Sequence, residues 1–326
     1  MRLFLFAILV LGPALLAADP SSVAEPGEPF GRIESLDPAF DALVPKDAKI
    51  ERLATGFLWA EGPTWVPSGG FVAFSDVKRN IAYRWKPGEG LKEYLNPSGF
   101  TGESTDSPEP GSNGLNVDLD GHVIACQHGD RRIVRVRPDG SFETLADRWE
   151  GKRFNSPNDV AIHPTLGDIF FTDPPWGLKG AARSSYRELD FLGVYRLSAA
   201  GALSLIAKDL SPNGVTFARD GKTLYVTNGR GIVAFDVSPE GNVSNRRPFF
   251  DCSVVGKRGG PDGMECHSSG ALFIGWLGGG VVVVSPEGKH LGTIRTDVRT
   301  ANCCFDADES TLYITANNWL ARVRLK

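Results

Sequence analysis

Pairs of short runs rich in β-branched and aromatic residues recur along this chain from about residue 50 to its end. Examples are Phe71-Val72-Ala73-Phe74 and Thr223-Leu224-Tyr225-Val226, and turn residues such as Gly, Pro, Asn and Asp separate the runs. Runs of this length and composition, without helical spacing, are typical of buried β-strands. The pattern therefore predicts an all-β chain.

A short motif precedes the first strand of each pair, and its first position is polar in five of six copies. Successive first positions lie 39 to 55 residues apart, which is the period of propeller blades. The six first positions are Glu61, Asn113, Asn158, Asn213, Asp262 and Ala301. The repeat predicts a six-bladed β-propeller with four-stranded blades.

The two ends of the repeat region complement each other. The last blade lacks a fourth strand, because the chain ends just after the run Leu320–Leu325. A spare run, Ile50–Ala54, precedes the first blade. If these two runs pair, an N-terminal strand completes the last blade and closes the ring, which leaves no long edge strand exposed. Residues 49–326 are therefore expected to form the propeller.

The first 18 residues differ from the rest of the chain. Met1-Arg2 gives a positive start, Leu3–Leu16 is almost wholly apolar, and Leu15-Leu16-Ala17-Ala18 resembles a small-residue cleavage site. This is typical of a secretory signal peptide. The apolar run is shorter than the roughly 20 residues that span a bilayer, so we expect an exported protein, periplasmic or secreted, without a membrane partner after cleavage. Residues 19–48 are expected to be a linker or a loosely packed lead-in.

Composition removes some classes of partner and site. The formal net charge is −4, and acidic and basic residues are interspersed without a basic stripe, so nucleic acid is not expected as a partner. The spacing of the five cysteines matches no zinc pattern. Cys126, Cys266, Cys303 and Cys304 are expected to be small buried hydrophobes in strands, and a disulfide between Cys252 and Cys266 stays open.

The first positions carry the candidate chemistry. In a propeller the innermost strand of each blade runs along the central channel, so residues at equal register meet at one level. Two carboxylates and three amides would meet there, and such oxygen donors suit a calcium ion, whereas sites built for zinc or copper favour His and Cys. Asn-Gly and Asp-Gly are also ordinary turn sequences. The shared register, and a Glu that turns do not favour, make the metal interpretation the stronger one.

Several motifs together resemble the regucalcin (senescence marker protein)/gluconolactonase-like family of six-bladed propellers. The resemblance extends from about Ile50 to Lys326. The motifs are Glu61-Gly62-Pro63, the stretch Arg153-Phe154-Asn155-Ser156-Pro157-Asn158-Asp159, Thr172-Asp173-Pro174-Pro175-Trp176-Gly177, Ser211-Pro212-Asn213-Gly214, Pro261-Asp262-Gly263 and Asn302-Cys303-Cys304-Phe305.

The resemblance implies a site and an activity. Members of the family hydrolyse sugar lactones, so the expected partner is a small-molecule sugar lactone. The family implies a Ca²⁺ ion, with Zn²⁺, Mn²⁺ or Mg²⁺ as alternatives, held by Glu61, Asn158, Asn213 and Asp262. It also implies that Asp262 acts as the acid/base residue. Trp176 stands where many bacterial relatives have Tyr.

Four further residues are expected to contact substrate. Asn113 is the polar first position outside the implied metal set, so it is expected to bind substrate hydroxyls. His128 and Trp176 lie on loops between second and third strands, which open on the same face as the first positions. His128 could equally be only solvated. Arg153 stands at the start of the motif that contains Asn158.

Three functions remain open at this point. The leading hypothesis is a calcium-dependent hydrolase that opens sugar lactones, and its catalytic residue would be Asp262. An alternative is hydrolysis of phosphotriesters or other esters at the same metal site. The third is a non-catalytic propeller that binds a carbohydrate or a protein, with calcium as a structural staple.

Overall fold

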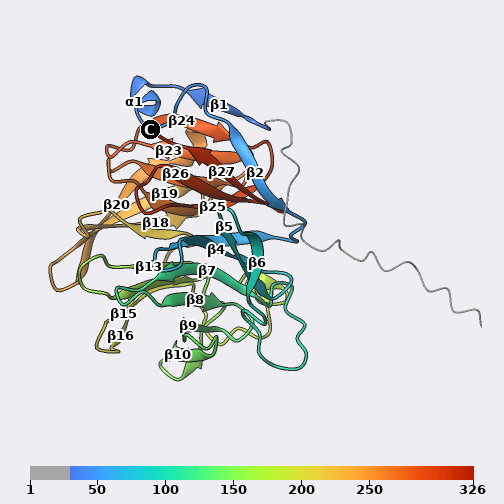
Figure 1. Ribbon diagram of the computed structural model, residues 1–326. Coiled ribbons are helices and arrows are strands. Elements are labelled where there is room, and N and C mark those ends of the chain that lie inside the picture. Colours follow the sequence, from blue (N-terminus) through green and yellow to red (C-terminus); the bar gives the residue numbers. More distant parts are fainter. Residues whose placement is uncertain (1–29) are drawn as a thin grey trace, which may run out of the picture.

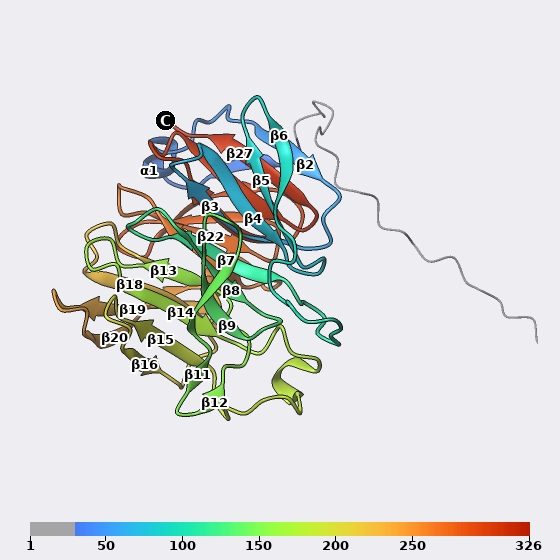
Figure 2. The same ribbon diagram turned by 60° about the horizontal axis from the view of Figure 1, so that its bottom comes forward.

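The computed structural model describes residues 30–326, which form six antiparallel blades around a central channel (Figures 1 and 2). The first three blades contain β3 (Ala60–Val66), β4 (Phe71–Asp76), β5 (Ile81–Lys86) and β6 (Gly90–Leu95); β7 (Ser112–Val117), β8 (Val123–Gln127), β9 (Arg132–Val136) and β10 (Phe142–Ala146); and β13 (Val160–Ile162), β14 (Ile169–Asp173), β15 (Gly193–Leu197) and β16 (Leu203–Ala207).

The second half of the ring repeats this order. Its strands are β17 (Val215–Phe217), β18 (Thr223–Asn228), β19 (Gly231–Val237) and β20 (Val243–Asp251); β21 (Pro261–Cys266), β22 (Leu272–Trp276), β23 (Gly280–Val284) and β24 (His290–Arg295); and β25 (Thr300–Phe305), β26 (Thr311–Ala316) and β27 (Trp319–Arg324) with β2 (Ile50–Thr55). Two short strands, β11 (Arg148–Trp149) and β12 (Lys152–Arg153), form a separate hairpin, and 3₁₀ turns span Ala181–Arg183 and Cys252–Val254. The predicted six-bladed propeller is confirmed.

The ring closes in the sixth blade, as the sequence predicts. Strand β2 pairs antiparallel with β27, with Ile50 opposite Val323 and Thr55 opposite Trp319. The blade therefore combines strands from both ends of the propeller, and each protects an edge that the other would expose.

The segment ahead of the propeller is packed in its described part, from residue 30 onward, rather than loose. Strand β1 (Arg32–Ser35) adds a fifth strand to the fifth blade by pairing with β24, and α1 (Pro38–Asp41) lies beside it near the C-terminus (Figure 1). Phe40 and Val44 are fully buried, because they are apolar residues that fill the junction between the fifth and sixth blades. The expected linker at 19–48 is therefore wrong for these residues. The expected signal peptide at 1–18 lies outside the described residues.

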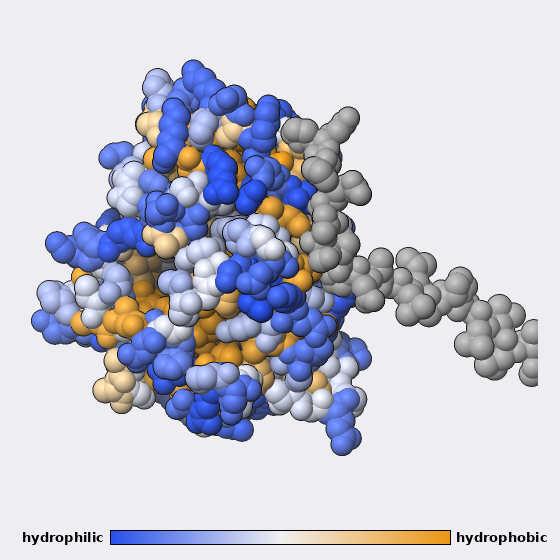
Figure 3. Space-filling model, in the orientation of Figure 1, coloured by the Kyte–Doolittle hydropathy of each residue, from blue (hydrophilic) through white to orange (hydrophobic). Residues whose placement is uncertain are grey.

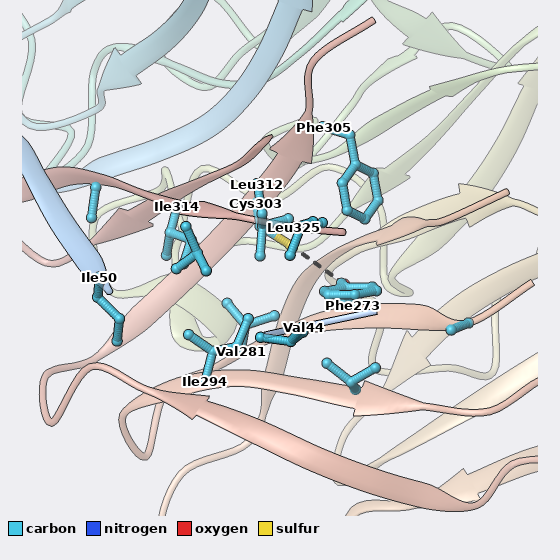
Figure 4. Packing of buried hydrophobic residues seen from close by; sticks show 14 of the residues in the cluster. Val44, Ile50, Phe273, Val281, Ile294, Cys303, Phe305, Leu312, Ile314 and Leu325 are labelled. Atoms are coloured by element: carbon cyan, nitrogen blue, oxygen red, sulfur yellow. Dashed lines mark hydrogen bonds between the residues drawn. The ribbon is translucent and has the colours of Figure 1, made fainter. Parts of the chain in front are cut away.

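The core at this junction is shown in Figure 4. Val44 and Ile50 from the N-terminal segment pack in one cluster with Phe273, Ile314 and Leu325 from the last two blades. The backbone N–H of Lys326 also donates to the carbonyl of Leu43 at 3.0 Å. The N-terminal segment thus covers the place where the ring closes.

All five cysteines are free and buried. The Sγ of Cys303 donates to the carbonyl of Phe273 at 3.5 Å, which is the dashed line in Figure 4. Burial raises the pKa of the Cys303 and Cys304 thiols well above the usual value. They are small buried hydrophobes, as expected.

Hydrophilic side chains cover most of the outline of the face in Figure 3, and hydrophobic ones gather toward its middle. Opposite charges on the surface pair across strands, as Arg322 does with Glu51 at 2.7 Å. Within residues 30–326, no helix has both the length and the apolar character needed to cross a bilayer.

Candidate metal and substrate site

A cavity of about 340 Å³ opens where the innermost strands begin. All five polar first positions line it, together with residues from the loops around its mouth. The lining residues are Trp59, Glu61, Lys78, Glu109, Asn113, Asn158, Trp176, Asn213, Asp262, Leu277 and Arg299. The sequence repeat therefore brings two carboxylates and three amides from five blades into one cavity.

Glycine at the second position of the motif lets the innermost strands approach each other. A Cβ atom on Gly214 would lie 2.3 Å from the carbonyl oxygen of Asp262 in the next blade. A Cβ atom on Gly114 would lie 2.7 Å from the carbonyl oxygen of Asn158. Atoms this close must move apart, so any side chain there would separate the first positions. The Asn-Gly pairs serve close packing around the channel as well as a local turn.

Aspartates at the ends of second strands fix the backbone that leads into the site. The carboxylate of Asp173 accepts hydrogen bonds from the N–H groups of Asn155 at 2.7 Å and Ser156 at 2.8 Å. In the first blade, Asp76 accepts from the N–H of Trp59 at 3.0 Å. These buried bonds satisfy donors that strand pairing leaves free. They set the entry of the chain into the third and first innermost strands.

Glu61 and Asp262 are the two carboxylates among the first positions, and they are 3% and 5% exposed. Burial, followed by the charge of Asp159, raises the pKa of Asp262 to about 8. Burial and then the charge of Asp262 raise the pKa of Glu61 well above its usual value. Neither forms an ion pair with another residue in the described chain. Because buried carboxylates need a compensating charge, this donor set fits a hard divalent cation.

The amide of Asn158 is oriented by a buried histidine. His128 has no exposed surface, and burial lowers its pKa to about 3, so the ring is neutral. Its Nδ1 lies 3.6 Å from the Oε2 of Glu109, and a proton is favoured on the nitrogen that faces a carboxylate. Nε2 then accepts from the Nδ2 of Asn158, 3.3 Å away. The oxygen of the Asn158 amide is left for the cavity.

The structure does not place two of the expected substrate contacts, His128 and Arg153, in the lining of the cavity. His128 lies beneath Asn158, fully buried, because its loop packs inward against the loop that carries Trp176. Arg153 belongs to the short strand β12 outside the cavity, where its guanidinium donates to the carbonyl of Asp130 at 2.8 Å. The motif that contains Arg153 leads into the site, but the Arg153 side chain contacts the turn between β8 and β9 of the second blade.

The other two expected contacts line the cavity. Asn113 is 4% exposed, and its side chain makes no hydrogen bond within the described residues, so its amide is available to a ligand. Trp176 is 44% exposed at the rim. Its loop is held in place, since Tyr186 donates to Asp106 at 2.8 Å and Ser107 donates to the carbonyl of Gly177 at 2.5 Å. Trp176 thus forms a wall of the cavity.

Sequence reasoning missed several residues that line the mouth. They are Trp59, Lys78, Glu109, Leu277 and Arg299. The strand order itself indicates where such residues lie. Two kinds of connection open on this face: the turn from second to third strand, which holds Lys78, and the segment just ahead of each innermost strand.

A second acidic group lies at the opposite end of β7 from Asn113. Asp118, Asp120 and His122 offer ligand atoms within 4.8 Å of one another. However, one oxygen of Asp118 already accepts from the N–H groups of Asp120 at 3.1 Å and His122 at 2.8 Å. Its other oxygen pairs with Arg135 at 2.9 Å. These bonds are those of an ordinary Asx turn.

Comparison with known proteins gives consistent matches. The family model described as SMP-30/Gluconolactonase/LRE-like region matches residues 59–318. A gluconolactonase from Zymomonas mobilis is 36% identical over 317 residues, which cover 92% of this chain and 88% of the relative. A gluconolactonase structure from Xanthomonas campestris has a TM-score of 0.80 at 30% identity and covers 93% of this chain and 99% of its own. A calcium-binding regucalcin from Agrobacterium tumefaciens shares the fold, with a TM-score of 0.65 at 18% identity and coverage of 83% and 92%.

Proposed function

We propose that this chain, which belongs to the SMP-30/gluconolactonase/LRE-like family, opens sugar lactones by hydrolysis with the help of a bound divalent cation. That it is a lactone hydrolase follows from gluconolactonase relatives that match nearly its whole length. The observation that carries the cation is the pair of buried carboxylates, Glu61 and Asp262, which have no ion-pair partner in the described chain.

The cation would be held by oxygen atoms of Glu61, Asn158, Asn213 and Asp262. Two carboxylates balance the charge of a divalent ion, and amide oxygens add ligands without further charge. Among residues 30–326, no His or Cys side chain lines the cavity, and this favours calcium over zinc. The calcium-binding regucalcin that shares the fold supports the same choice of ion.

Asp262 is the proposed base. Its carboxylate removes a proton from the attacking water, the water oxygen bonds to the lactone carbonyl carbon, and the ring C–O bond breaks. The proton then passes from Asp262 to the leaving ring oxygen, so that atoms and charge balance. A cation bound by these ligands supplies polarisation of the carbonyl and keeps Asp262 ionised. Asn113 hydrogen-bonds substrate hydroxyls, and Trp176 covers the rim.

Chelation separates this function from a purely structural role of the cation. We expect chelator-treated protein to keep its β circular-dichroism spectrum, to lose hydrolysis of glucono-δ-lactone, and to regain it with calcium. Unfolding on chelation, or retained turnover, would contradict the proposal.

The role of Asp262 is tested by Asp262→Asn at saturating calcium. The variant keeps one ligand oxygen but loses the base, so kcat should fall by about 100-fold or more. Asn113→Ala is the matched comparison, and its main effect should be a higher KM. Near wild-type turnover in Asp262→Asn with the cation bound would assign the base elsewhere.

We also propose that the protein acts outside the cytoplasm. The support is the sequence of residues 1–18 alone, with its positive start and apolar run. Mass spectrometry of the protein exported from a bacterial host should give a mature chain that begins near Ala18 or Asp19. A mature chain that keeps Met1 would contradict export with cleavage.

A further inference from the structure

Two cationic side chains lie over one aromatic ring at the rim of the cavity. The Nζ of Lys78 is 5.5 Å from the centre of the Trp59 ring, and the Cζ of Arg299 is 4.7 Å from a ring centre of the same side chain. Both side chains are exposed, and neither makes a hydrogen bond or ion pair with another described residue. An aromatic face attracts a cation without neutralising it. Both positive charges therefore remain available to a ligand.

Trp59, whose ring lies under these cations, is held in place by its surroundings. The backbone N–H of Trp59 donates to Asp76 at 3.0 Å, and the Trp59 carbonyl accepts from the N–H of Val77 at 3.1 Å. The Trp59 side chain packs against Val77 and Ala301 and is 8% exposed. Ala301 is the one first position without an oxygen. Beside Ala301, where the other five blades offer a polar first position, the cavity is therefore lined by the Trp59 ring and its two cations.

The charge balance of the cavity indicates what these cations serve. Three carboxylates (Glu61, Glu109 and Asp262) face the two cations in the lining. Lys78 and Arg299 lower the pKa of Glu109, although burial outweighs them and leaves it raised. Once a divalent cation neutralises Glu61 and Asp262, the net charge of the cavity lining becomes positive. A neutral lactone offers this surplus charge no partner.

We propose that Lys78 and Arg299 form an anion subsite and that the preferred substrate is a sugar lactone with a second, anionic group, a carboxylate or a phosphate, remote from the lactone carbonyl. The inference rests on the proposed function, since the lactone itself is bound at the metal end of the cavity. A guanidinium binds either oxyanion in a bidentate manner, and an ammonium adds a point charge. The cavity of about 340 Å³ is at the small end of the usual range of about 300–1,000 Å³, which suits a monosaccharide-sized ligand.

The test compares three lactones on the calcium-loaded protein. They are glucono-δ-lactone, the same lactone with a phosphate on its primary hydroxyl, and the monolactone of glucaric acid, which has a carboxylate there. The variants are Lys78→Gln, Arg299→Gln and the double substitution. Lys222→Gln is the control, because it removes an exposed cation from the turn between β17 and β18 at the other end of the channel.

We expect one or both anionic lactones to have a higher kcat/KM than the neutral lactone, and added salt to reduce this preference. Each single substitution should lower kcat/KM about tenfold for the preferred anionic lactone. The loss for the neutral lactone should be clearly smaller, and Lys222→Gln should leave all three substrates unaffected. Preference for the phosphate or for the carboxylate identifies which group the subsite takes.

Equal kcat/KM for the neutral and anionic lactones, or the same loss for all three in the variants, would overturn the anion subsite while leaving lactone hydrolysis intact. If the protein turns over no lactone, the proposed function fails instead. Calorimetric binding of the open-chain phosphorylated aldonate and the aldarate then still tests the subsite. Binding that Lys78→Gln and Arg299→Gln do not weaken would overturn it.

Discussion

Asn158 carries two groups of opposite chemistry on one side chain, an oxygen that binds cations and an amide nitrogen that does not. The neutral ring of His128 accepts from the nitrogen and so directs the oxygen to the cavity. The sequence places both residues near the site. It does not show that the ring lies beneath the amide, because a repeat predicts the register of a strand and not the direction of a loop side chain.

Replacement of His128 by Phe tests this orienting role. His128→Phe keeps the ring shape but removes the acceptor, so the amide is free to turn and calcium affinity should fall about tenfold, as is usual when a residue that orients a metal ligand is lost. In an Asn158→Asp background both ends of the side chain are oxygens, so the same substitution should not weaken binding. Calorimetry of the four proteins gives the comparison. Equal losses in both backgrounds would mean that His128 only fills space.

At the scale of the elements, the strands and their order follow from the periodicity of short apolar runs. The closure of β2 on β27 was predictable because the last blade was one strand short. The packed segment around Phe40 was not predicted, because its apolar residues, among them Ile33, Phe40 and Leu43, stand between prolines and acidic residues and form no strand-like run. Lys78 and Arg299 were not predicted, because connections between strands have no periodic pattern. The sequence predicts only that such connections open on the face of the first positions.

Gly214 tests whether the motif glycines bring the site together. In Gly214→Ala the new methyl group would meet the carbonyl of Asp262 at 2.3 Å and force the fourth and fifth innermost strands apart. We expect about 1–3 kcal/mol lower unfolding free energy, as for other overpacked sites, and weaker calcium binding. Denaturant unfolding and calorimetry measure the two effects.

Gly256→Ala is the control for this change, because no atom of the described chain lies within 4 Å of its added Cβ. Gly256→Ala should change neither the free energy of unfolding nor the calcium affinity. Unchanged calcium affinity in Gly214→Ala would show that the spacing of these strands does not set the site.

At the scale of the whole molecule, buried carboxylates around the channel make stability depend on pH and on the cation. Burial raises the pKa of Asp262 to about 8 and that of Asp159 to about 7. In the unfolded chain both groups titrate near 4. Between about pH 4 and pH 8 the folded, metal-free protein binds more protons than the unfolded chain. Its free energy of unfolding therefore falls as pH rises.

The melting temperature of chelator-treated protein should therefore decrease from pH 5 to pH 8. Calcium binding needs deprotonated ligands, so the increase in melting temperature that calcium gives should be larger at pH 8 than at pH 5. Thermal unfolding with and without calcium at both pH values measures this. A calcium effect that is independent of pH would contradict the assignment of Glu61 and Asp262 as its ligands.

The most direct test of the central claim is calorimetric titration of metal-free protein with calcium. The account predicts one site per chain, with affinity strongly reduced in Glu61→Gln and in Asn213→Ala, because each loses a ligand group in the cavity. Asp120→Asn is the control, since it alters the acidic turn at the far end of β7 and should bind calcium like the wild type. Unchanged affinity in Glu61→Gln and Asn213→Ala, with loss of binding in Asp120→Asn, would place the ion at that turn and contradict the account.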